Sequence, residues 1–344
     1  MTGDAGRGTL PGFCVREIMT KPRKWLLRIA SVFAAGFILL NIAAYHHARS
    51  MMFFSRGGVR TERPEQLSLA GKFKILATGI TLPRPVTDLT PSALDPDCRE
   101  IGIPCPGLGL LSAWYVDRGA QTPLVVMFHG YGAEKTCMRF EAGEFLNMGA
   151  SVLLVDFRGC GASPGELTTI GYLEGEDVAA VARHVREKLP HSRMVLFGQS
   201  MGAAAILRAI ATQGVQPDAV ILEAVFDTML NTIGNRFHTM GLPSFPAARL
   251  LLFWAGVQCG FNGFDHRPME YARSLRCPSL FLHGRHDPRT TIADGRRVFV
   301  NAAGPKSFVI FENAAHLGFA GAEPAGWRAS VRPLVSGGAF PPQP

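Results

Sequence analysis

Short apolar runs rich in β-branched residues alternate with longer amphipathic stretches from Ala113 onward. Apolar positions at helical spacing lie between these runs, at residues 175–188 and 201–213. Such alternation is typical of a mostly parallel sheet with helices on both faces, so the pattern predicts an α/β fold. The predicted strands are residues 124–129, 151–156, 194–198, 219–223, 279–283 and 307–311.

One connection, of roughly 55 residues between Glu223 and Ser279, is too long for a simple crossover. It contains Pro243, Pro246 and the apolar run 250–254, which predicts a partly helical cap over about residues 225–275, between the sixth and seventh strands. The stretch 46–110 is proline-containing and poorly periodic, and is expected to form an extended lead-in with a strand or two. The domain proper is predicted at residues 111–344.

An apolar run extends from Ile29 to Tyr45, and Asn41 interrupts it. Counted from Trp25 it has about 21 residues, enough for a helix to cross roughly 30 Å of hydrocarbon. Basic residues precede it, which favours a cytoplasmic segment 1–24, a single-pass anchor at 25–45 and a periplasmic or extracellular domain. Residues 51–54, MMFF, are then expected at the far membrane interface.

Two alternatives to an anchor are a cleaved signal peptide and a buried core helix. Cleavage after Ala44 would place Ile42 three residues before the cut, where a small residue is preferred. A core helix fits poorly because the run is apolar all round. Met19, directly before the basic flank, is an alternative start to Met1.

The chain has 344 residues, 47% of them hydrophobic, enough for one large domain with a substantial core. Its formal net charge is +8, which raises the question of nucleic-acid binding. Residues 1–74 hold twelve Lys/Arg against four Asp/Glu, whereas the remainder is balanced at twenty-three of each. The basic excess therefore belongs to the amino-terminal segment, and no nucleic-acid partner is expected.

Seven cysteines are too few for a disulfide scaffold in a chain of this length. No Cys/His grouping has the spacing of a zinc site, so no metal is expected. If residues 25–45 are an anchor, Cys14 is cytoplasmic and the other six are exported, where disulfides persist. Cys98 and Cys105 flank a proline- and glycine-containing loop and are the pair best suited to bridge, against the alternative of free thiols.

The pentapeptide GQSMG at residues 198–202 follows an apolar strand and precedes an alanine-rich helix. Strand, G-x-S-x-G and helix in this order are what a nucleophile elbow requires, since only glycine fits on either side of the serine. Ser200 is therefore the predicted nucleophile. The alternative is a glycine-rich strand–helix turn without chemistry.

A serine hydroxyl needs a positioned base near neutral pH, and imidazole suits that range. His316 lies late in the chain after the last predicted strand, where the base is expected; His129, His283 and His286 are expected to be structural. The acid should follow a strand between nucleophile and base. Asp287 meets this condition and is preferred. Its rivals after the preceding strand are Glu223 and Asp227.

A tetrahedral intermediate needs at least two N–H donors directed at its oxyanion. Met201 follows the nucleophile at a helix amino terminus and supplies the first predicted donor. The second is assigned to Tyr131, in the glycine-rich loop HGYG at residues 129–132 after the first core strand. The alternative for this loop is an ordinary βα turn.

With these motifs in order, the chain resembles the α/β-hydrolase superfamily, in the branch of serine aminopeptidase-like and monoglyceride-lipase-like proteins. The resemblance runs from about Leu111 to Leu334. It rests on residues 129–132 (HGYG), 156–163 (DFRGCGAS), 198–202 (GQSMG), 283–287 (HGRHD) and 315–316 (AH). In this family the second motif is a structural loop, so Asp156, Arg158 and Ser163 are not expected to be catalytic.

The resemblance implies a serine hydrolase with a Ser-His-Asp triad, an acyl-enzyme intermediate and no metal or organic cofactor. The apolar cap and the anchor favour a small-molecule or lipid-like acyl ester as substrate. Fold does not fix the substrate, so thioester and peptide cleavage and acyl transfer to an alcohol stay open. A non-catalytic scaffold that binds a partner is the remaining alternative, although no triad residue is missing.

Overall fold

The computed structural model describes residues 20–62 and 67–338. Most of the predicted cytoplasmic segment, with Cys14 and Met19, lies outside these ranges. The chain divides into two compact units, residues 1–43 and 44–344. Helix α1 (Thr20–Met52) continues from the first unit into the second.

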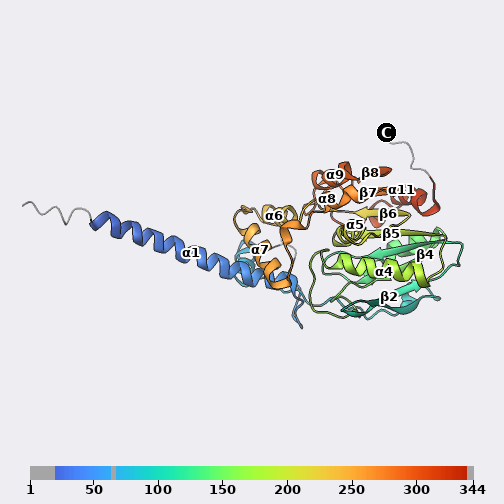
Figure 1. Cartoon of the computed structure of the whole chain (residues 1–344), viewed down its shortest axis with the longest axis horizontal. Helices are drawn as coiled ribbons and strands as arrows, with labels where there is room; N and C mark the ends of the chain where they lie inside the picture. The colour runs from blue at the N-terminus through green and yellow to red at the C-terminus, as the bar shows by residue number, and fades with distance from the viewer. Residues whose placement is uncertain (1–19, 63–66, 339–344) are drawn as a thin grey trace, which may run out of the picture. The chain divides into compact units, whose positions relative to one another are not determined.

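The second unit contains one eight-stranded sheet, in the order β1-β2-β4-β3-β5-β6-β7-β8 (Figure 1). The first two strands form an antiparallel hairpin, β2 is antiparallel to β4, and all other neighbours are parallel. The predicted mostly parallel α/β fold is confirmed. The strands are β1 (Arg99–Cys105), β2 (Gly109–Val116), β3 (Pro123–Phe128), β4 (Ser151–Val155), β5 (Arg193–Gln199), β6 (Ala219–Glu223), β7 (Ser279–Gly284) and β8 (Lys306–Phe311).

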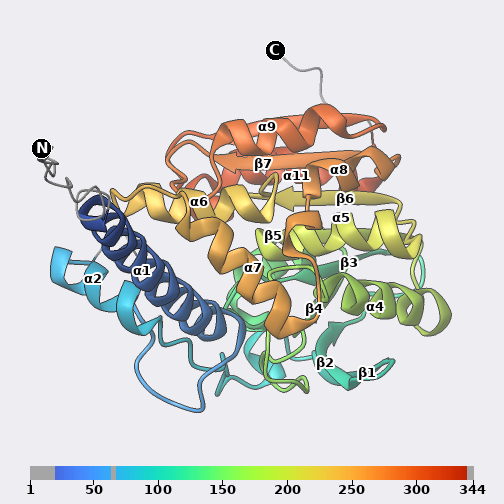
Figure 2. The same cartoon turned by 60° about the vertical axis from the view of Figure 1, so that its left-hand side comes forward.

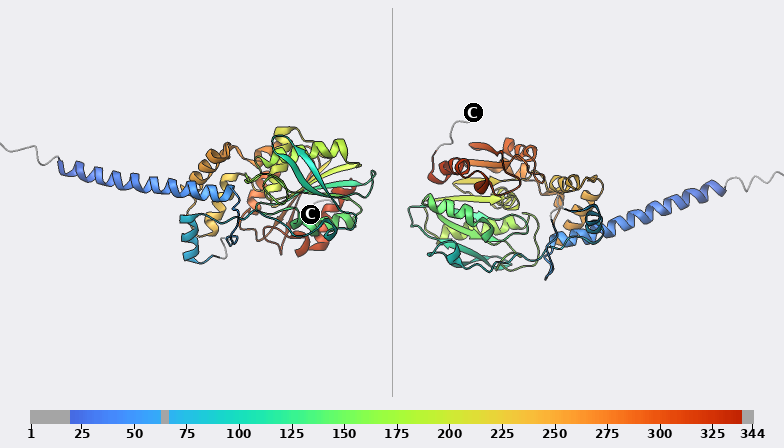
Figure 3. Two further views of the ribbon diagram at one scale, coloured as in Figure 1. Left: turned by 90° about the horizontal axis from the view of Figure 1, so that it is seen from below. Right: turned by 180° about the vertical axis from the view of Figure 1, so that it is seen from behind.

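Helices cover both faces of the sheet (Figures 2 and 3). Successive side chains of a strand point to opposite faces, so β5 supplies Leu196 to the core beneath α4 and α5 and Phe197 to the core beneath α3 and α11. The helices of the second unit are α2 (Leu69–Thr78), α3 (Arg139–Asn147), α4 (Glu174–Lys188), α5 (Met201–Gln213), α6 (Met229–Thr239), α7 (Ala247–Cys259), α8 (Pro268–Tyr271), α9 (Ile292–Asn301), α10 (Phe319–Ala322) and α11 (Pro324–Ser336).

The predicted cap is present as α6 and α7, inserted between β6 and β7. Helix α6 begins where the Thr228 side chain accepts a hydrogen bond from the Asn231 backbone N–H. Asn231 and Asn235 then donate from their side chains to Asp294 of α9, at 2.7 and 2.8 Å. Polar contacts therefore fix one side of the cap to the core.

Helix α1 is the one helix in the described ranges that is long and apolar enough to cross a membrane, over Lys24–Met52. Its most apolar window has no buried residue, which disfavours the core-helix alternative. Large apolar side chains of the first unit are exposed, including Phe33 at 74% and Leu39 at 66%. The helix is thus a candidate membrane span.

The last two turns of α1 belong to the second unit. Ala48, Met51 and Met52 are buried there. Met52 belongs to the core of the second unit and Met51 is buried beside it, while the expected position of residues 51–54 at a membrane interface stays a prediction.

Cys98 and Cys105 are free thiols, which is the alternative to a bridge that the sequence had left open. The intervening chain is the extended strand β1, which separates its ends by roughly 20 Å, whereas a disulfide needs Cα atoms within about 7 Å. Cys105 instead donates from its thiol to a carboxylate oxygen of Asp177, at 3.5 Å.

Candidate active site

Ser200 lies at the tight turn between β5 and α5, with φ 51° and ψ −105°, a conformation that a non-glycine residue rarely adopts. A Cβ atom on Gly202 would lie 2.2 Å from the backbone oxygen of Phe128. One on Gly198 would lie 2.6 Å from the backbone nitrogen of Ala203. The predicted elbow is therefore present, and its glycines are required sterically.

His316 connects the predicted nucleophile to the predicted acid. Its Nε2 lies 3.1 Å from Ser200 Oγ and its Nδ1 lies 2.7 Å from a carboxylate oxygen of Asp287. The loop that carries His316 lies very close to the end of β7: a Cβ atom on Gly284 would be 1.9 Å from the Ala315 backbone oxygen. Three residues predicted from separate motifs thus form one hydrogen-bonded chain.

The Asp287 carboxylate accepts four hydrogen bonds. Besides His316, the donors are the backbone N–H groups of Arg289 and Thr290, at 2.8 and 3.0 Å, and the Thr290 hydroxyl, at 2.5 Å. Burial alone would raise the pKa of Asp287, but the bonds from His316 and Thr290 lower it below its usual value. An ionised carboxylate places the proton of His316 on Nδ1 and leaves Nε2 to accept from Ser200.

The rival acids Glu223 and Asp227 are engaged elsewhere. Glu223 accepts a hydrogen bond from the Trp327 indole N–H at 2.7 Å, and Asp227 accepts from Arg297 at 2.7 Å. Among the described interactions, neither carboxyl contacts His316. The geometry therefore favours Asp287.

A second carboxyl cluster lies directly behind the elbow. The side-chain amide of Gln199 donates to Glu223 at 3.0 Å and to Glu141 at 3.3 Å, and the Ser200 backbone N–H donates to the Glu223 backbone oxygen at 2.8 Å. Burial, followed by the charge of Glu141, raises the pKa of Glu223 to about 8. Sequence reasoning missed this pair, although a glutamate ending an apolar strand was the available signal.

The two predicted oxyanion donors flank the serine. Gly130 packs so closely that a Cβ atom there would lie 3.8 Å from Ser200 Cβ. Within the described part of the chain, the backbone N–H groups of Tyr131 and Met201 donate no hydrogen bond. Neither group is therefore engaged in a described hydrogen bond, and their role as oxyanion donors stays a prediction.

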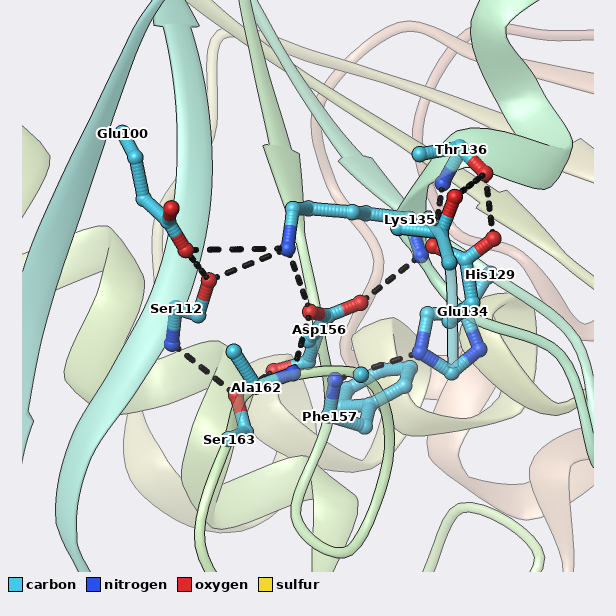
Figure 4. A network of polar contacts seen from close by, with 12 residues as sticks. Glu100, Ser112, His129, Glu134, Lys135, Thr136, Asp156, Phe157, Ala162 and Ser163 are labelled. Carbon is cyan, nitrogen blue, oxygen red and sulfur yellow. Dashed lines mark hydrogen bonds and ion pairs between the residues drawn. The ribbon is translucent and has the colours of Figure 1, made fainter. Parts of the chain in front are cut away.

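A buried polar network supports the loop that carries Tyr131 (Figure 4). Asp156 accepts from the Lys135 backbone N–H at 2.8 Å and forms an ion pair with its ammonium group at 2.6 Å. The Ser163 hydroxyl donates to the Asp156 backbone oxygen at 2.7 Å and accepts from the Ser112 N–H at 2.9 Å. Asp156 and Ser163 thus hold two loops to the sheet and do not contact the predicted triad in any described interaction.

Two buried histidines also brace the surrounding loops. His129 donates from Nδ1 to the Gly130 backbone oxygen at 2.8 Å and accepts from the Phe157 N–H at 3.1 Å. His283 donates to the Thr290 backbone oxygen at 2.7 Å. Burial lowers the pKa of both, so both are neutral near pH 7. No group of three or more His, Cys, Asp or Glu among the described residues is placed to hold a metal ion.

A cavity of about 530 Å³ opens in front of Ser200 and His316. Its wall combines the end of α1 and the segment after it, the loop 130–133, and the cap helices. Apolar lining residues include Met51, Ile75, Leu82, Ile233, Phe237 and Leu251; polar ones include His47, Arg60, Glu62, Arg236 and Arg289. Sequence reasoning missed the contribution of residues 47–62, because nothing in their pattern indicates long-range contacts.

A family model described as serine aminopeptidase, S33, matches residues 119–236. An uncharacterized Mycobacterium tuberculosis protein, Rv2307c, is 31% identical over 216 residues, which cover 60% of this chain and 68% of that protein. The Bacillus subtilis protein YqkD is 29% identical over 175 residues (50% and 57%). Lysophosphatidylserine lipase ABHD12 of Rattus norvegicus is 26% identical over 205 residues, 58% of this chain but only half of that protein.

Solved structures share the fold. The Pyrococcus furiosus esterase Pf2001 superposes with a TM-score of 0.62 at 22% identity, over 74% of this chain and 96% of that one. The Exiguobacterium antarcticum esterase gives 0.52 at 18% identity, over 69% and 100%. With its sheet, its cap and its match to the mycobacterial relative, the chain belongs to the α/β-hydrolase superfamily, in the serine aminopeptidase-like branch.

Proposed function

We propose that this protein is a membrane-anchored serine hydrolase that cleaves acyl esters through an acyl-enzyme intermediate. The observation that carries the proposal is the position of His316, 3.1 Å from Ser200 Oγ on one side and 2.7 Å from Asp287 on the other. This arrangement is what a serine nucleophile requires, because the imidazole must both accept its proton and be held in one tautomer.

In the first step Ser200 Oγ attacks the ester carbonyl while its proton moves to Nε2 of His316. The carbonyl oxygen becomes an oxyanion, which the N–H groups of Tyr131 and Met201 stabilise. When the tetrahedral intermediate collapses, the proton passes from His316 to the leaving alcohol and the acyl group stays on Ser200. Water then repeats the sequence with His316 as base, which releases the acid and restores the serine. Asp287 stays ionised and stabilises the imidazolium throughout.

The substrate class we propose is a lipid-like acyl ester. A cavity of about 530 Å³ is large enough for a medium acyl chain or a small amphiphile. Its lining joins apolar cap residues with arginines, which suits a molecule with an apolar chain and a polar head. ABHD12 of Rattus norvegicus, half of whose length this chain matches, is a lysophosphatidylserine lipase. The apolar helix at the amino terminus would keep such an enzyme at a membrane.

Hydrolysis of a p-nitrophenyl ester series from acetate to palmitate by the full-length protein in detergent tests this proposal. We expect kcat/KM to peak at an intermediate chain length, and Ser200→Ala to lose activity by at least about 10³-fold. A matched thioester and an anilide of the preferred acyl chain decide between ester, thioester and amide. Equal activity of wild type and Ser200→Ala would reject the mechanism.

A further inference from the structure

The side chain of Tyr131 makes a contact that the proposed chemistry does not use. Its hydroxyl donates to the Met51 backbone oxygen at 2.6 Å, in the last turn of α1. The guanidinium of Arg236 lies over its ring, 5.2 Å from the centroid. The residue that offers a backbone N–H to the oxyanion is thus fastened to a segment far away in the sequence.

The next residue in the loop is fastened to the same segment. Arg60 donates from Nη1 to the Gly132 backbone oxygen at 2.7 Å. Gly132 has a φ of 63°, and a Cβ atom there would lie 2.8 Å from Arg60 Nη2. The guanidinium therefore lies directly against the loop backbone, where a Cβ atom on residue 132 would displace it.

A third contact reaches the other proposed donor. The Met52 backbone oxygen accepts from the Thr168 N–H at 2.8 Å, and the Thr168 hydroxyl lies 3.4 Å from the sulfur of Met201. The segment 51–60 thus touches the surroundings of both N–H groups. It lies outside residues 119–236, which match the family model.

We propose that residues 51–60 act as a clamp that positions the oxyanion hole, with the Tyr131 hydroxyl and Arg60 as positioning groups. Donors stabilise an oxyanion only when they are held about 2.7–3.1 Å from it before the reaction begins. The buried ion pair of Lys135 and Asp156 holds the loop after residue 133, and the clamp holds residues 131 and 132. The end of α1 is then part of the catalytic unit. This inference rests on the proposed function.

The test uses the full-length protein in detergent with p-nitrophenyl butyrate, and compares Tyr131→Phe, Arg60→Met and Arg60→Lys with wild type. Tyr131→Phe keeps the ring and loses only the hydroxyl, so we expect kcat to fall about 10-fold with KM changed less than about two-fold. Arg60→Met should behave alike, and Arg60→Lys should recover most of kcat because the ammonium still donates. Tyr115→Phe is the matched control: its hydroxyl is buried in β2, away from the cavity lining, and its kcat should be unchanged.

Wild-type kcat in both Tyr131→Phe and Arg60→Met would overturn the clamp. A rise in KM at constant kcat would also overturn it, since that result assigns these groups to substrate binding. If Tyr131→Phe does not fold, the difference between Arg60→Met and Arg60→Lys decides. Failure of the proposed function is a separate result, seen as activity that survives Ser200→Ala.

Discussion

At the residue scale, the main question is which carboxyl group is the acid of the proposed triad. Asp287, Glu223 and Asp227 all follow strands at the same edge of the sheet, so sequence order alone leaves each of them possible. Of these three carboxyl groups, only that of Asp287 contacts His316 in the described interactions. Its four hydrogen-bond donors keep it ionised. The other two carboxyls serve the core and the cap.

Asp287→Asn should lower kcat by about 10³- to 10⁴-fold with little change in KM, because an amide no longer fixes the Nδ1–H tautomer of His316. Steady-state kinetics with a short ester measure this. Asp227→Asn is the matched control; it removes a carboxylate of equal charge that pairs with Arg297, and should change kcat less than about 10-fold. A larger loss in Asp227→Asn than in Asp287→Asn would reassign the acid.

The raised pKa of Glu223 predicts that the free energy of unfolding depends on pH. Its pKa is raised in the folded protein to about 8 from 4.5, so between these values the folded state holds a proton that the unfolded state releases. Its contribution to stability is fully present below about pH 4.5 and is lost as the pH rises to about 8. Thermal melts of wild type and Glu223→Gln at about pH 5 and pH 7.5 should therefore show wild type losing stability relative to the variant. An equal difference at both pH values would contradict the assignment.

At the element scale, the cap is the part of the fold that shapes the cavity. The length of the connection predicted a cap at about 225–275, and α6 and α7 lie within that range. Its attachment was not predictable, because Asn235 of α6 contacts Asp294 and the Arg289 backbone oxygen, more than 50 residues later in the chain. Side-chain amides in a helix carry no signal of such distant partners.

Asn235→Ala should loosen the cap, since it removes hydrogen bonds of 2.8 and 3.0 Å next to the acid loop. We expect KM for a long-chain ester to rise about three- to ten-fold while kcat for a short ester stays within about two-fold. Asn301→Ala also removes two hydrogen bonds, to Met269 and Arg297 backbone oxygens, outside the cavity lining. Identical KM changes in the two variants would show that the attachment of α6 does not shape the cavity.

The strands differ in how clearly the sequence predicts them. All six strands predicted from apolar runs are present with bounds shifted by at most two residues, since a buried parallel strand is apolar along its whole length. The hairpin β1–β2 lies partly in the stretch 46–110 and had no clear signal, because its outer strand is mostly exposed and contains Pro104. The proposed triad follows from motif order, whereas the proposed clamp at 51–60 depends on side-chain contacts to distant backbone oxygens, which no sequence pattern encodes.

At the scale of the whole molecule, helix α1 carries the apolar candidate membrane span and ends within the second unit, which has the α/β-hydrolase fold. The basic excess lies in residues 1–74, and the rest of the chain is balanced in charge. Because Met51 lies in the last turn of α1 and its backbone oxygen accepts a hydrogen bond from Tyr131, the end of this helix is also part of the proposed site.

The basic flank predicts a cytoplasmic amino terminus and an exported domain, and this orientation can be measured. Full-length protein should stay in the membrane pellet after alkaline carbonate extraction, because a span of about 20 apolar residues is not released by charge disruption. Alkaline phosphatase fused to the carboxyl end should be active, since that reporter folds only outside the cytoplasm. An inactive fusion with an intact membrane fraction would place the domain on the cytoplasmic side and reject the orientation.

The proposed function depends on Ser200 acting as a nucleophile that His316 activates. Fluorophosphonate labelling of the folded, full-length protein, followed by mass spectrometry of the labelled peptide, measures this reactivity. We expect a single adduct on Ser200 in wild type and none in Ser200→Ala or His316→Ala. A folded wild-type protein that takes no label, or takes it on another residue, would rule out an activated Ser200 and favour a non-catalytic scaffold that binds a partner.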